Sequence, residues 1–560
     1  MSKIDATRYL NMNFTNDDTL RVVFSVAAAL PVVYIGFQAF WWALRRYMIE
    51  KTTARNQTQT IGKPRKDGKL RGTCVVAGGS IGGLVCARAM TFHFEKVIVV
   101  EPDEILVDKR SRVGQWGQIH AFHNIIVKSS DALFPDFRRD VKAIGGHFFH
   151  PHSMYWQLGK DMMPFPPSDD DCEELGMTRM GLETIIRQNA FKKEYGIEFV
   201  AGTVVGATPD AKGERFQGVH IRRNDAKTSY YQEADFVVDC SGPVCAGAKW
   251  IQRPLSRDGT SASEVKTKWG PVQRSQYFPD VAYSTSVITI DEKLLKERPS
   301  LPRNPKSWDN AGFLHLVHPS PSTDPRASMI FNAEKNTIVF SAACKGLASE
   351  LPDDLEGFRN WAESIQNTTG NRSLPPYVLD IIDIAQRSKD EFGHDIVFNK
   401  YKFTNCHLLK YTETKVPHNF VAVGDSLVRV NPIFGMGVSK AFVDVLTLDQ
   451  ILREKASASR GIPDRLSKAY FAKELPRADW LLQMTKDLDF GCSYVKPLDP
   501  GSKLSHGAPF RWFVDGILTV AARNPSVAKT VGRVFFFDAP PLDLMAPSLV
   551  FKAVKANLFG

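Results

Sequence analysis

A glycine-rich turn near residue 80 carries the first residues whose types and spacing could do chemistry. An apolar run, Thr73–Ala77, leads into Gly78-Gly-Ser-Ile-Gly-Gly83 and an apolar helical pattern, and a second run, Val97–Val100, ends in Glu101. The unpaired amides and the dipole at the start of such a helix stabilise a pyrophosphate, while the acid accepts hydrogen bonds from ribose hydroxyls. This order of elements predicts a dinucleotide site built on Gly78, Ser80, Gly83 and Glu101.

Two residues of this unit bear on the choice of nucleotide. Ser80 stands where G-x-G-x-x-G has its middle glycine, so its side chain must point away from the phosphates or donate to them. Glu101 favours an unphosphorylated ribose, as in FAD or NAD, over NADP. A glycine turn alone also serves any tight strand-to-helix connection, and it is the flanking strands, helix and acid that favour the nucleotide.

A second constellation lies about 340 residues further along the chain. The apolar run Phe420–Val423 is followed by Gly424 and Asp425, then by Pro432, Gly435 and Gly437, and then by a helical apolar pattern. Asp425 at a strand end can hold a polyol, and a helix that starts at the two glycines points amides at a developing negative charge. The alternative is that Asp425 caps a helix and the glycines form an ordinary turn. Together the two constellations favour FAD.

The spacing G-D-x₆-P-x-x-G-x-G resembles the riboflavin-binding motif of the group A FAD-dependent monooxygenases related to p-hydroxybenzoate hydroxylase. Ala234–Gly242, with Asp239 and Gly242, is similar to a further flavin-contacting strand of that family. The segment from Arg179 through Glu183 to Arg187 is similar to its R-x-x-L-E helix, whose first arginine approaches the flavin. The resemblance covers roughly residues 72–450 and implies FAD at all of these positions.

Within that family the pattern is most similar to polyene and polyether epoxidases, and more remotely to squalene epoxidase. The segments that carry this narrower resemblance are Val113–His120, Leu351–Phe358, Tyr411–Glu413 and Asn431–Gly437. Gly114, Gly117 and Gln118 depart from the epoxidase pattern V-P-Q-G-R-H-x-H, which leaves the role of that stretch open. His120 and His123 are expected to be ordinary packed or surface histidines.

The resemblance implies an α/β fold, with a Rossmann-type FAD-binding domain, an inserted mixed β-sheet substrate domain and C-terminal helices. It also implies that one oxygen atom of O₂ enters a substrate by epoxidation or hydroxylation, through a flavin C4a-hydroperoxide, with NAD(P)H as the reductant and a separate flavin reductase as a conceivable partner. Because the flavin carries this chemistry, no catalytic acid or base is assigned. An expected membrane anchor near a Phe-rich pocket, in a chain with 36 phenylalanines, favours a lipophilic terpenoid or polyketide substrate over a small aromatic acid, as in secondary metabolism.

Proteins with other functions can also contain the two glycine turns. A FAD-dependent reductase or dehydrogenase, similar to geranylgeranyl reductases, would carry both and would not incorporate O₂. The tryptophan-type flavin halogenases normally contain a W-x-W-x-I-P segment, which this sequence lacks. A non-enzymatic scaffold with the same fold is the third alternative.

Composition excludes several classes of protein. The 560 residues are 43% hydrophobic and 24% charged, which is typical of globular domains. The eight cysteines are scattered without a C-x-x-C pair, so neither a zinc site nor a disulfide framework is expected and no metal is assigned. The net charge of +10 is concentrated in residues 45–71, which hold nine basic and two acidic residues without the aromatic interleaving of a nucleic-acid site.

This basic segment follows an uncharged apolar run, Val22–Leu44, whose 23 residues have the length of a membrane span. We therefore expect a transmembrane helix with a cytosolic catalytic domain, in the endoplasmic reticulum if the source is eukaryotic. The tail beyond residue 453 is expected to form helices over Leu466–Leu488 and Phe510–Val534, which either join the core or rest on a membrane surface. The expected segments are a short tail (1–21), a transmembrane helix (22–44), a basic linker (45–71), a split FAD-binding domain (72–250 and 401–452), a substrate domain (251–400) and a C-terminal helical region (453–560).

Overall fold

A seven-stranded sheet forms the centre of the protein in the computed structural model, which describes residues 16–104, 110, 112–158, 161–167, 172–262, 267–302, 308–320, 323–367, 370–371 and 374–559. The strand order is β20-β10-β1-β2-β7-β8-β9; neighbours from β20 to β7 pair in parallel, and β8 and β9 continue the sheet as an antiparallel extension. The strands are β1 (Leu70–Ala77), β2 (Phe94–Glu101), β7 (Ile197–Pro209), β8 (Phe216–Arg223), β9 (Tyr230–Glu233), β10 (Phe236–Asp239) and β20 (Phe420–Ala422).

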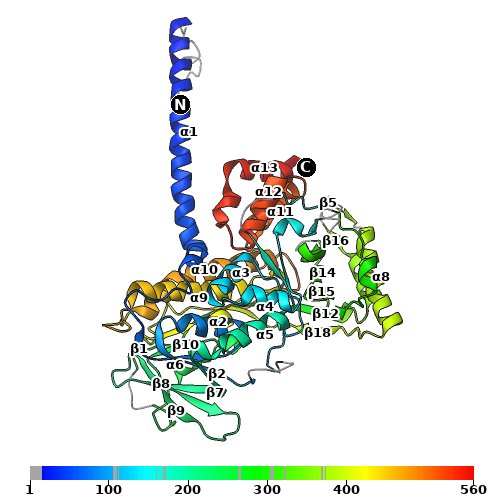
Figure 1. Cartoon of the computed structure of the whole chain (residues 1–560). Coiled ribbons are helices and arrows are strands. Elements are labelled where there is room, and N and C mark those ends of the chain that lie inside the picture. Colours follow the sequence, from blue (N-terminus) through cyan, green and yellow to red (C-terminus); the bar gives the residue numbers. More distant parts are fainter. Residues whose placement is uncertain are drawn as a thin grey trace.

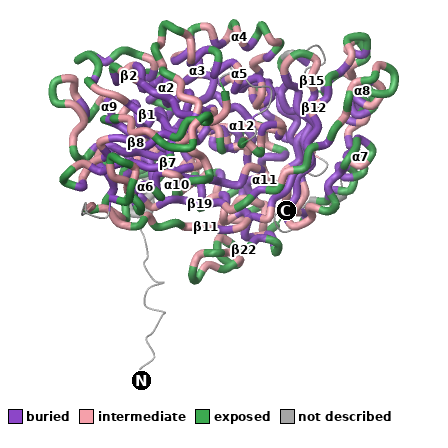
Figure 2. The backbone as a smooth tube through the Cα atoms, turned by 90° about the horizontal axis from the view of Figure 1, so that it is seen from below, coloured by how far each residue is buried: buried purple, intermediate pink, exposed green. Residues whose placement is uncertain are grey.

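The parallel strands are covered by helices, as their continuous apolar sequences predict. Figure 2 shows the tube around β1 and β2 largely in the colour of buried residues. Helix α2 packs on β1 and β2 and contacts α5 and α9, so the glycine turn before it is held between the sheet and two other helices. The helices of this region are α2 (Ile81–Met90), α3 (Asn124–Leu133), α4 (Phe137–Ala143), α5 (Arg179–Ala190), α6 (Ala246–Gln252), α9 (Gly437–Lys455) and α10 (Leu466–Asp489).

A five-stranded antiparallel sheet, ordered β13-β14-β15-β12-β18, lies beside the parallel one (Figure 1). Helix α7 packs on β14 and β15, helix α8 on β12, and this half of the molecule has its own hydrophobic core. The elements are β12 (Val281–Thr289), β13 (Phe313–Val317), β14 (Arg326–Asn332), β15 (Thr337–Lys345), β18 (Asn399–Lys402), α7 (Leu355–Ser364) and α8 (Pro376–Phe392).

Smaller elements join the two sheets. A four-stranded sheet, ordered β21-β19-β11-β22, combines strands from four distant parts of the chain. Its strands are β11 (Arg274–Phe278), β19 (Cys406–Leu409), β21 (Val428–Arg429) and β22 (Lys496–Pro497), and the two-stranded sheets pair β3 (His147–Phe149) with β6 (Glu174–Gly176), β4 (Gln157–Leu158) with β5 (Asp161–Met162), and β16 (Gln366–Asn367) with β17 (Gly370–Asn371). The mixed α/β architecture predicted from the sequence is confirmed.

The C-terminal region is helical, but one predicted helix is divided. The stretch expected as one helix forms α11 (Ala508–Ala521) and α12 (Pro525–Phe535). The break has a local cause: Pro525 lacks a backbone N–H and suits a first helical position, and the Asn524 side chain accepts a hydrogen bond from Val527 N, which caps the new helix. A 3₁₀ turn, η11 (Pro541–Met545), and α13 (Pro547–Phe559) end the chain.

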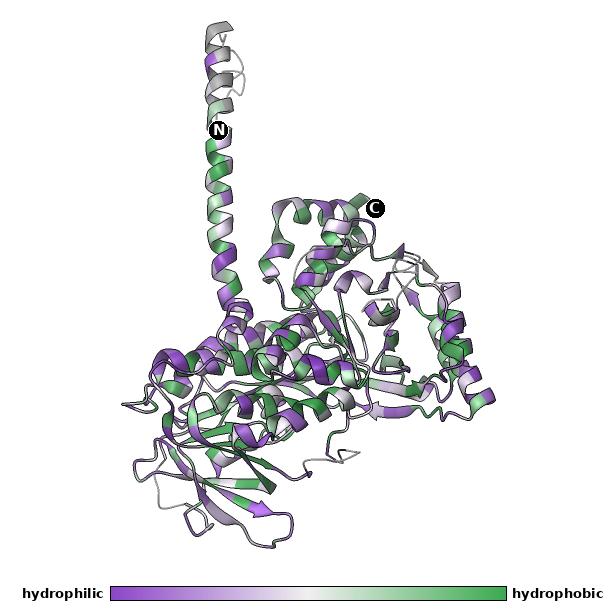
Figure 3. Cartoon of the chain, viewed as in Figure 1, coloured by the Kyte–Doolittle hydropathy of each residue, from purple (hydrophilic) through white to green (hydrophobic). Residues whose placement is uncertain are grey.

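The predicted transmembrane helix and single-pass membrane localisation are wrong, because in the part of the chain that the structure describes no helix is long and apolar enough to cross a membrane. The apolar run is the middle of a longer helix, α1 (Asn16–Thr52), which stands away from the body (Figures 1 and 3). The charged residues expected to flank a span belong to this same helix, and its last turns are docked: Arg45 pairs with Asp543 at 2.8 Å and Arg477 donates to Glu50 O at 2.6 Å.

The segment expected as a basic linker is anchored in this structure. After α1 it forms a 3₁₀ helix, η2 (Arg55–Gln59), and it enters β1 at Leu70. Arg65 is 8% exposed and donates to Leu452 O at 2.9 Å and to Ala456 O at 2.7 Å at the end of α9. Arg65 therefore satisfies backbone carbonyls at the end of α9.

Candidate functional site

One cavity of about 540 Å³ lies where the parallel sheet, the antiparallel sheet and the C-terminal helices meet. Both glycine turns open into it, although they are far apart in sequence. Of the residues assigned to a cofactor from the sequence, all but Asp239 line this cavity: Gly78, Ser80, Gly83, Glu101, Arg179, Gly242, Gly424, Asp425, Pro432, Gly435 and Gly437.

The first turn is shaped by close backbone contacts. Gly78 has φ +117°, and a Cβ there would lie 2.3 Å from Cys240 O. A Cβ on Gly83 would lie 1.9 Å from Gly78 O, so α2 approaches the preceding strand as closely as backbones allow. Ser80 is the N-cap of α2 with extended backbone angles, and its side chain makes no capping hydrogen bond. The first amides of α2 therefore have no side-chain cap at the cavity wall.

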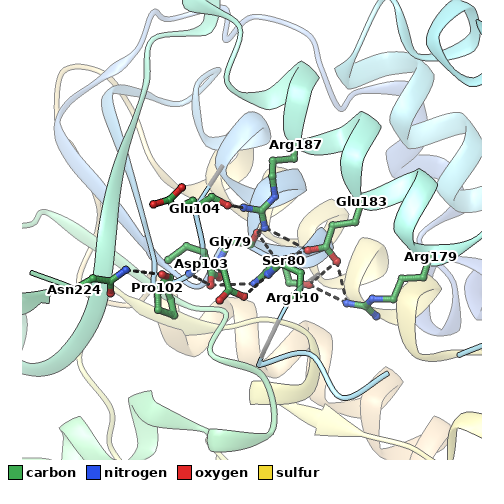
Figure 4. A network of polar contacts seen from close by, with 11 residues as sticks. Gly79, Ser80, Pro102, Asp103, Glu104, Arg110, Arg179, Glu183, Arg187 and Asn224 are labelled. Atoms are coloured by element: carbon green, nitrogen blue, oxygen red, sulfur yellow. Dashed lines mark hydrogen bonds and ion pairs between the residues drawn. The ribbon is translucent and has the colours of Figure 1, made fainter. Parts of the chain in front are cut away.

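The Ser80 hydroxyl is instead part of a polar network beside the turn (Figure 4). It accepts a hydrogen bond from Arg179 Nη2 at 2.9 Å and donates to Glu183 Oε2 at 3.2 Å. Glu183 also pairs with Arg179 at 3.1 Å and with Arg110. Because the hydroxyl is engaged on this side, the serine is accommodated in the glycine-type turn without its side chain capping the helix.

Glu101, at the end of β2, is 4% exposed and is held in place from several directions. Its carboxylate accepts from Gly79 N at 2.6 Å and Asp103 N at 3.1 Å and pairs with Arg110 at 3.0 Å. Burial lowers the pKa of Arg110, but the carboxylates of Glu183, Glu101 and Asp103 outweigh it and raise that pKa above its ordinary value. Arg110 is therefore a fixed cation among three carboxylates, and no motif in the sequence pointed to it.

The second turn is held by the helix that follows it. Gly424 has φ +70°, and its N–H donates to Asp444 Oδ2 at 2.6 Å, while Lys440 Nζ donates to the same oxygen at 2.6 Å. Burial raises the pKa of Asp444 and Lys440 opposes this rise. The neighbouring Asp425 is directed differently: its side chain is 36% exposed and lies 3.3 Å from Arg429 Nε.

A buried ion pair fixes the loop before α9. Lys345 on β15 and Asp489 at the end of α10 lie 2.6 Å apart and are 1% and 0% exposed. Asp489 also accepts from Asn431 Nδ2 at 2.9 Å and from Tyr277 at 2.8 Å. Asn431 in turn caps the short turn at Pro432, so groups from the antiparallel sheet and the C-terminal region hold this loop against the cavity.

Asp239 has a structural position rather than a cavity-lining one. It is fully buried, and its oxygens accept from Ser241 N at 2.9 Å and Gly247 N at 2.7 Å. Burial raises its pKa, and these hydrogen bonds oppose the rise. Its contacts organise the loop that contains Gly242, which does line the cavity.

The arrangement suits FAD. The helices α2 and α9 both begin at the cavity, and neither has a side-chain cap, since Ser80 and Met436 make no capping hydrogen bond. Two uncapped helix N-termini stabilise negative charge at two places, as a pyrophosphate and a reduced flavin ring require. The turn has no room for side chains at Gly78 and Gly83, because a Cβ at either position would meet backbone atoms of the protein.

The rest of the cavity is largely apolar and comes from residues that sequence reasoning did not single out. Met154, Trp156, Phe313, Leu316, Met329, Phe535 and Phe536 line it. Two histidines on its wall are kept neutral: burial lowers the pKa of His120 to about 3 and that of His318 to about 4. His120 Nδ1 donates to Gln118 O at 2.9 Å, and its Nε2 accepts from Arg179 at 3.3 Å. These side chains come from four separate stretches of chain, so no local pattern could reveal them.

The chain was compared with known proteins and with solved structures. No family model matches the chain. Protein Rv3254 of Mycobacterium tuberculosis is 22% identical over 527 residues, which cover 90% of this chain and 96% of that protein. Among solved structures, the flavin-dependent brominase Bmp2 superposes with a TM-score of 0.53 at 13% identity, covering 87% of this chain and 98% of that one.

Further solved structures are similar to this chain in fold. A mutant of PqsL, the probable FAD-dependent monooxygenase of Pseudomonas aeruginosa, gives a TM-score of 0.51 at 13% identity and covers 80% of this chain and 100% of its own. PyrE3, described as a Diels-Alderase of pyrroindomycin biosynthesis, gives 0.50 at 12% identity, with 83% and 80% covered. The chain has the fold of the FAD-dependent monooxygenases. Because proteins of different activity share this fold, the reaction has to be argued from the cavity itself.

Proposed function

We propose that this protein is a FAD-dependent monooxygenase that transfers one oxygen atom of O₂ to a lipophilic substrate. The single observation that carries the proposal is the continuity of the cavity, in which the two uncapped helix ends open into the same space as a wall of Met154, Trp156, Phe535 and Phe536. A flavin held by the two turns would therefore border an apolar chamber. Such a chamber suits a reaction that must exclude water.

FAD, when bound, would carry electrons from the reductant and react with O₂. The residues of this chain would bind the cofactor and stabilise negative charge on it. Glu101 would accept from the ribose hydroxyls, the amides of α2 would bind the pyrophosphate, and Asp425 would accept from the ribityl chain. The amides at the start of α9, with the loop held by Lys345, Asp489 and Asn431, would stabilise negative charge on the ring.

The uncharged, aromatic wall of the chamber supports a neutral lipophilic substrate. Its histidines His120 and His318 are neutral at physiological pH because burial lowers their pKa values, and the side chains around His318 are aromatic. Among the described residues, the contacts of His318 in the chamber are aromatic and include no free cation. Such a wall does not suit a small carboxylic acid, since a buried carboxylate needs a partner. We therefore expect a neutral lipophilic substrate, such as a terpenoid or polyketide, with NAD(P)H as the source of electrons, either directly or through a separate flavin reductase.

The test is isotope incorporation. The purified full chain, loaded with FAD, is supplied with NADPH or NADH, ¹⁸O₂ and a panel of neutral lipophilic alkenes and phenols, and the products are analysed by mass spectrometry. The expected product carries one ¹⁸O atom as an epoxide or hydroxyl group, with matched consumption of the nicotinamide. Absence of the visible absorbance bands of bound flavin would refute the cofactor assignment itself.

A FAD-dependent reductase of a lipophilic substrate is the second candidate, because both glycine turns serve that chemistry equally well. The same experiment separates the two. Unlabelled product, with turnover undiminished under nitrogen, would favour the reductase and refute the oxygen transfer.

A further inference from the structure

One histidine on the cavity wall, His123, differs from His120 in that both of its buried ring nitrogens lack a hydrogen-bond partner among the described residues. His123, directly before α3, is 2% exposed, lines the cavity and stacks on Phe536 with 4.9 Å between ring centroids. Neither Nδ1 nor Nε2 has a hydrogen-bond partner among the described residues. Among the described residues, the charged group paired with His123 is Glu174. Its Oε1 lies 3.4 Å from His123 Nδ1, without the alignment of a hydrogen bond.

Two other buried histidines have both ring nitrogens engaged. His93 is fully buried, and its Nε2 and Nδ1 contact Asp449 at 2.7 Å and Arg65 at 3.3 Å. His120, three residues before His123, also has both ring nitrogens engaged. A buried polar atom without a partner is costly, so an exception at a cavity wall indicates that a ligand supplies the missing hydrogen bond.

The carboxylate beside His123 determines which kind of hydrogen bond is missing. Glu174 is 1% exposed, and its Oε1 also lacks a partner, so a small rotation of the ring would let Nδ1–H donate to it. A neutral imidazole carries one proton, and a carboxylate at Nδ1 retains it there. The Nε2 atom is then an acceptor, and it requires a donor from the ligand.

The surroundings of His123 are apolar and lie next to the second glycine turn. Phe536 contacts Phe535, Phe535 contacts Trp156, and Trp156 contacts His318, which forms a continuous row of rings along the cavity. On the other side, Ala121 is within 3.1 Å of where a Cβ on Gly435 would be. A ligand bound to His123 would therefore lie between the aromatic row and the loop assigned to the flavin.

We propose that His123 is a substrate-contact residue, whose Nε2 accepts the hydrogen bond of a hydroxyl group on an otherwise apolar substrate, with Glu174 as the residue that positions the ring. This inference rests on the proposed function and narrows its substrate class to neutral lipophilic molecules that bear an alcohol or phenol. Molecules that offer only an ether or ester oxygen lack the donor that Nε2 needs.

The test uses two probes of similar size, 2-naphthol and 2-methoxynaphthalene, which differ in the hydroxyl donor. Their dissociation constants for the FAD-loaded full chain are measured by titration calorimetry, and the ratio of the methoxy to the hydroxyl constant is compared between variants. In His123→Leu the ratio is expected to fall about tenfold, the loss typical of one buried hydrogen bond. His123→Gln keeps an acceptor oxygen and should recover part of the ratio, and Glu174→Leu should lower it.

A matched control is His394→Leu, because His394 also faces a carboxylate, Asp291 at 3.3 Å, but lies far from the cavity beyond the end of α8. Its ratio should equal that of the unmodified protein. Flavin absorbance and the melting temperature of each variant show that it is folded and loaded. Failure of the unmodified chain to bind FAD would refute the proposed function, whereas normal flavin loading with a ratio unchanged in both His123 variants, or with no binding of 2-naphthol, would overturn this inference alone.

Discussion

The contact between Gly83 and the first glycine turn gives the most sharply defined perturbation in this protein. A Cβ on Gly83 would lie 1.9 Å from Gly78 O and 2.8 Å from Gly78 C, both of them backbone atoms. The neighbouring Gly82 differs by one position, and a Cβ there would meet only Ala441 Cβ, at 3.4 Å. Gly83→Ala and Gly82→Ala therefore add the same methyl group to the same helix in two different environments.

The expected magnitudes follow from these distances. A carbon and a carbonyl oxygen need more than 3 Å, so Gly83→Ala must displace α2 from β1 by about 1 Å or more. Overpacking of this kind costs about 1–3 kcal/mol and sometimes more, and the helix preference of alanine offsets at most about 1 kcal/mol of that. Gly82→Ala has ordinary contact distances and should be neutral or stabilising by up to about 1 kcal/mol.

The assay is urea unfolding of both variants and the unmodified protein, followed by intrinsic fluorescence without added FAD. FAD binding is then measured separately by titration, since displacement of α2 also moves the amides assigned to the pyrophosphate. The midpoint for Gly83→Ala should fall well below the other two. Equal midpoints for the two variants, or a lower one for Gly82→Ala, would show that the close contact at Gly83 does not determine the position of α2.

Three further predictions test the site. Asp425→Ala should weaken FAD binding about ten- to a hundredfold, through loss of a charged hydrogen-bond acceptor. The control Asp464→Ala, at a side chain that is 74% exposed, should leave FAD affinity unchanged. Equal affinities of the two variants in a fluorescence titration would contradict the role of Asp425. Lys345→Met should destabilise the fold by about 3–5 kcal/mol, because it leaves Asp489 buried without its ionic partner. The double variant Lys345→Met with Asp489→Leu should recover part of this loss in the same urea assay. A double variant less stable than Lys345→Met alone would show that an uncompensated buried charge is not the cause of the loss. Burial lowers the pKa of His407 to about 4 from 6.5, so the unfolded state takes up the proton first. His407 should contribute up to about 1.4 kcal/mol per pH unit to the fall in the free energy of unfolding as pH drops from 6.5 towards 4, in addition to the contributions of His120 and His318. His407→Gln should reduce this slope, and an unchanged slope in that variant would refute the contribution of His407.

The sequence alone determined the two glycine turns and the elements that flank them. Their geometry is local: a strand end, a residue with positive φ and a helix start lie within a few positions, so spacing and residue type are sufficient to predict them. This is why Gly78, Gly83, Gly424 and Gly435 line one cavity as a dinucleotide site would require. The resemblance of these motifs to the flavin monooxygenase family also implied an α/β fold, because the motifs are local in sequence.

Sequence patterns did not show which distant groups meet. Arg110 pairs with Glu101 and Glu183, and Asp239 turns to backbone amides, because the packing of α2, α5 and the strand ends decides which partners are within reach. Phe536 reaches His123 across more than 400 residues of chain. The apolar run near the N-terminus predicted a separate membrane span, but helix propagation continues through its charged flanks and tertiary contacts of Arg45 and Glu50 dock its end on the body. Local hydrogen bonding and periodicity specify elements, whereas the walls of the cavity arise only when elements from many distant stretches of chain pack together.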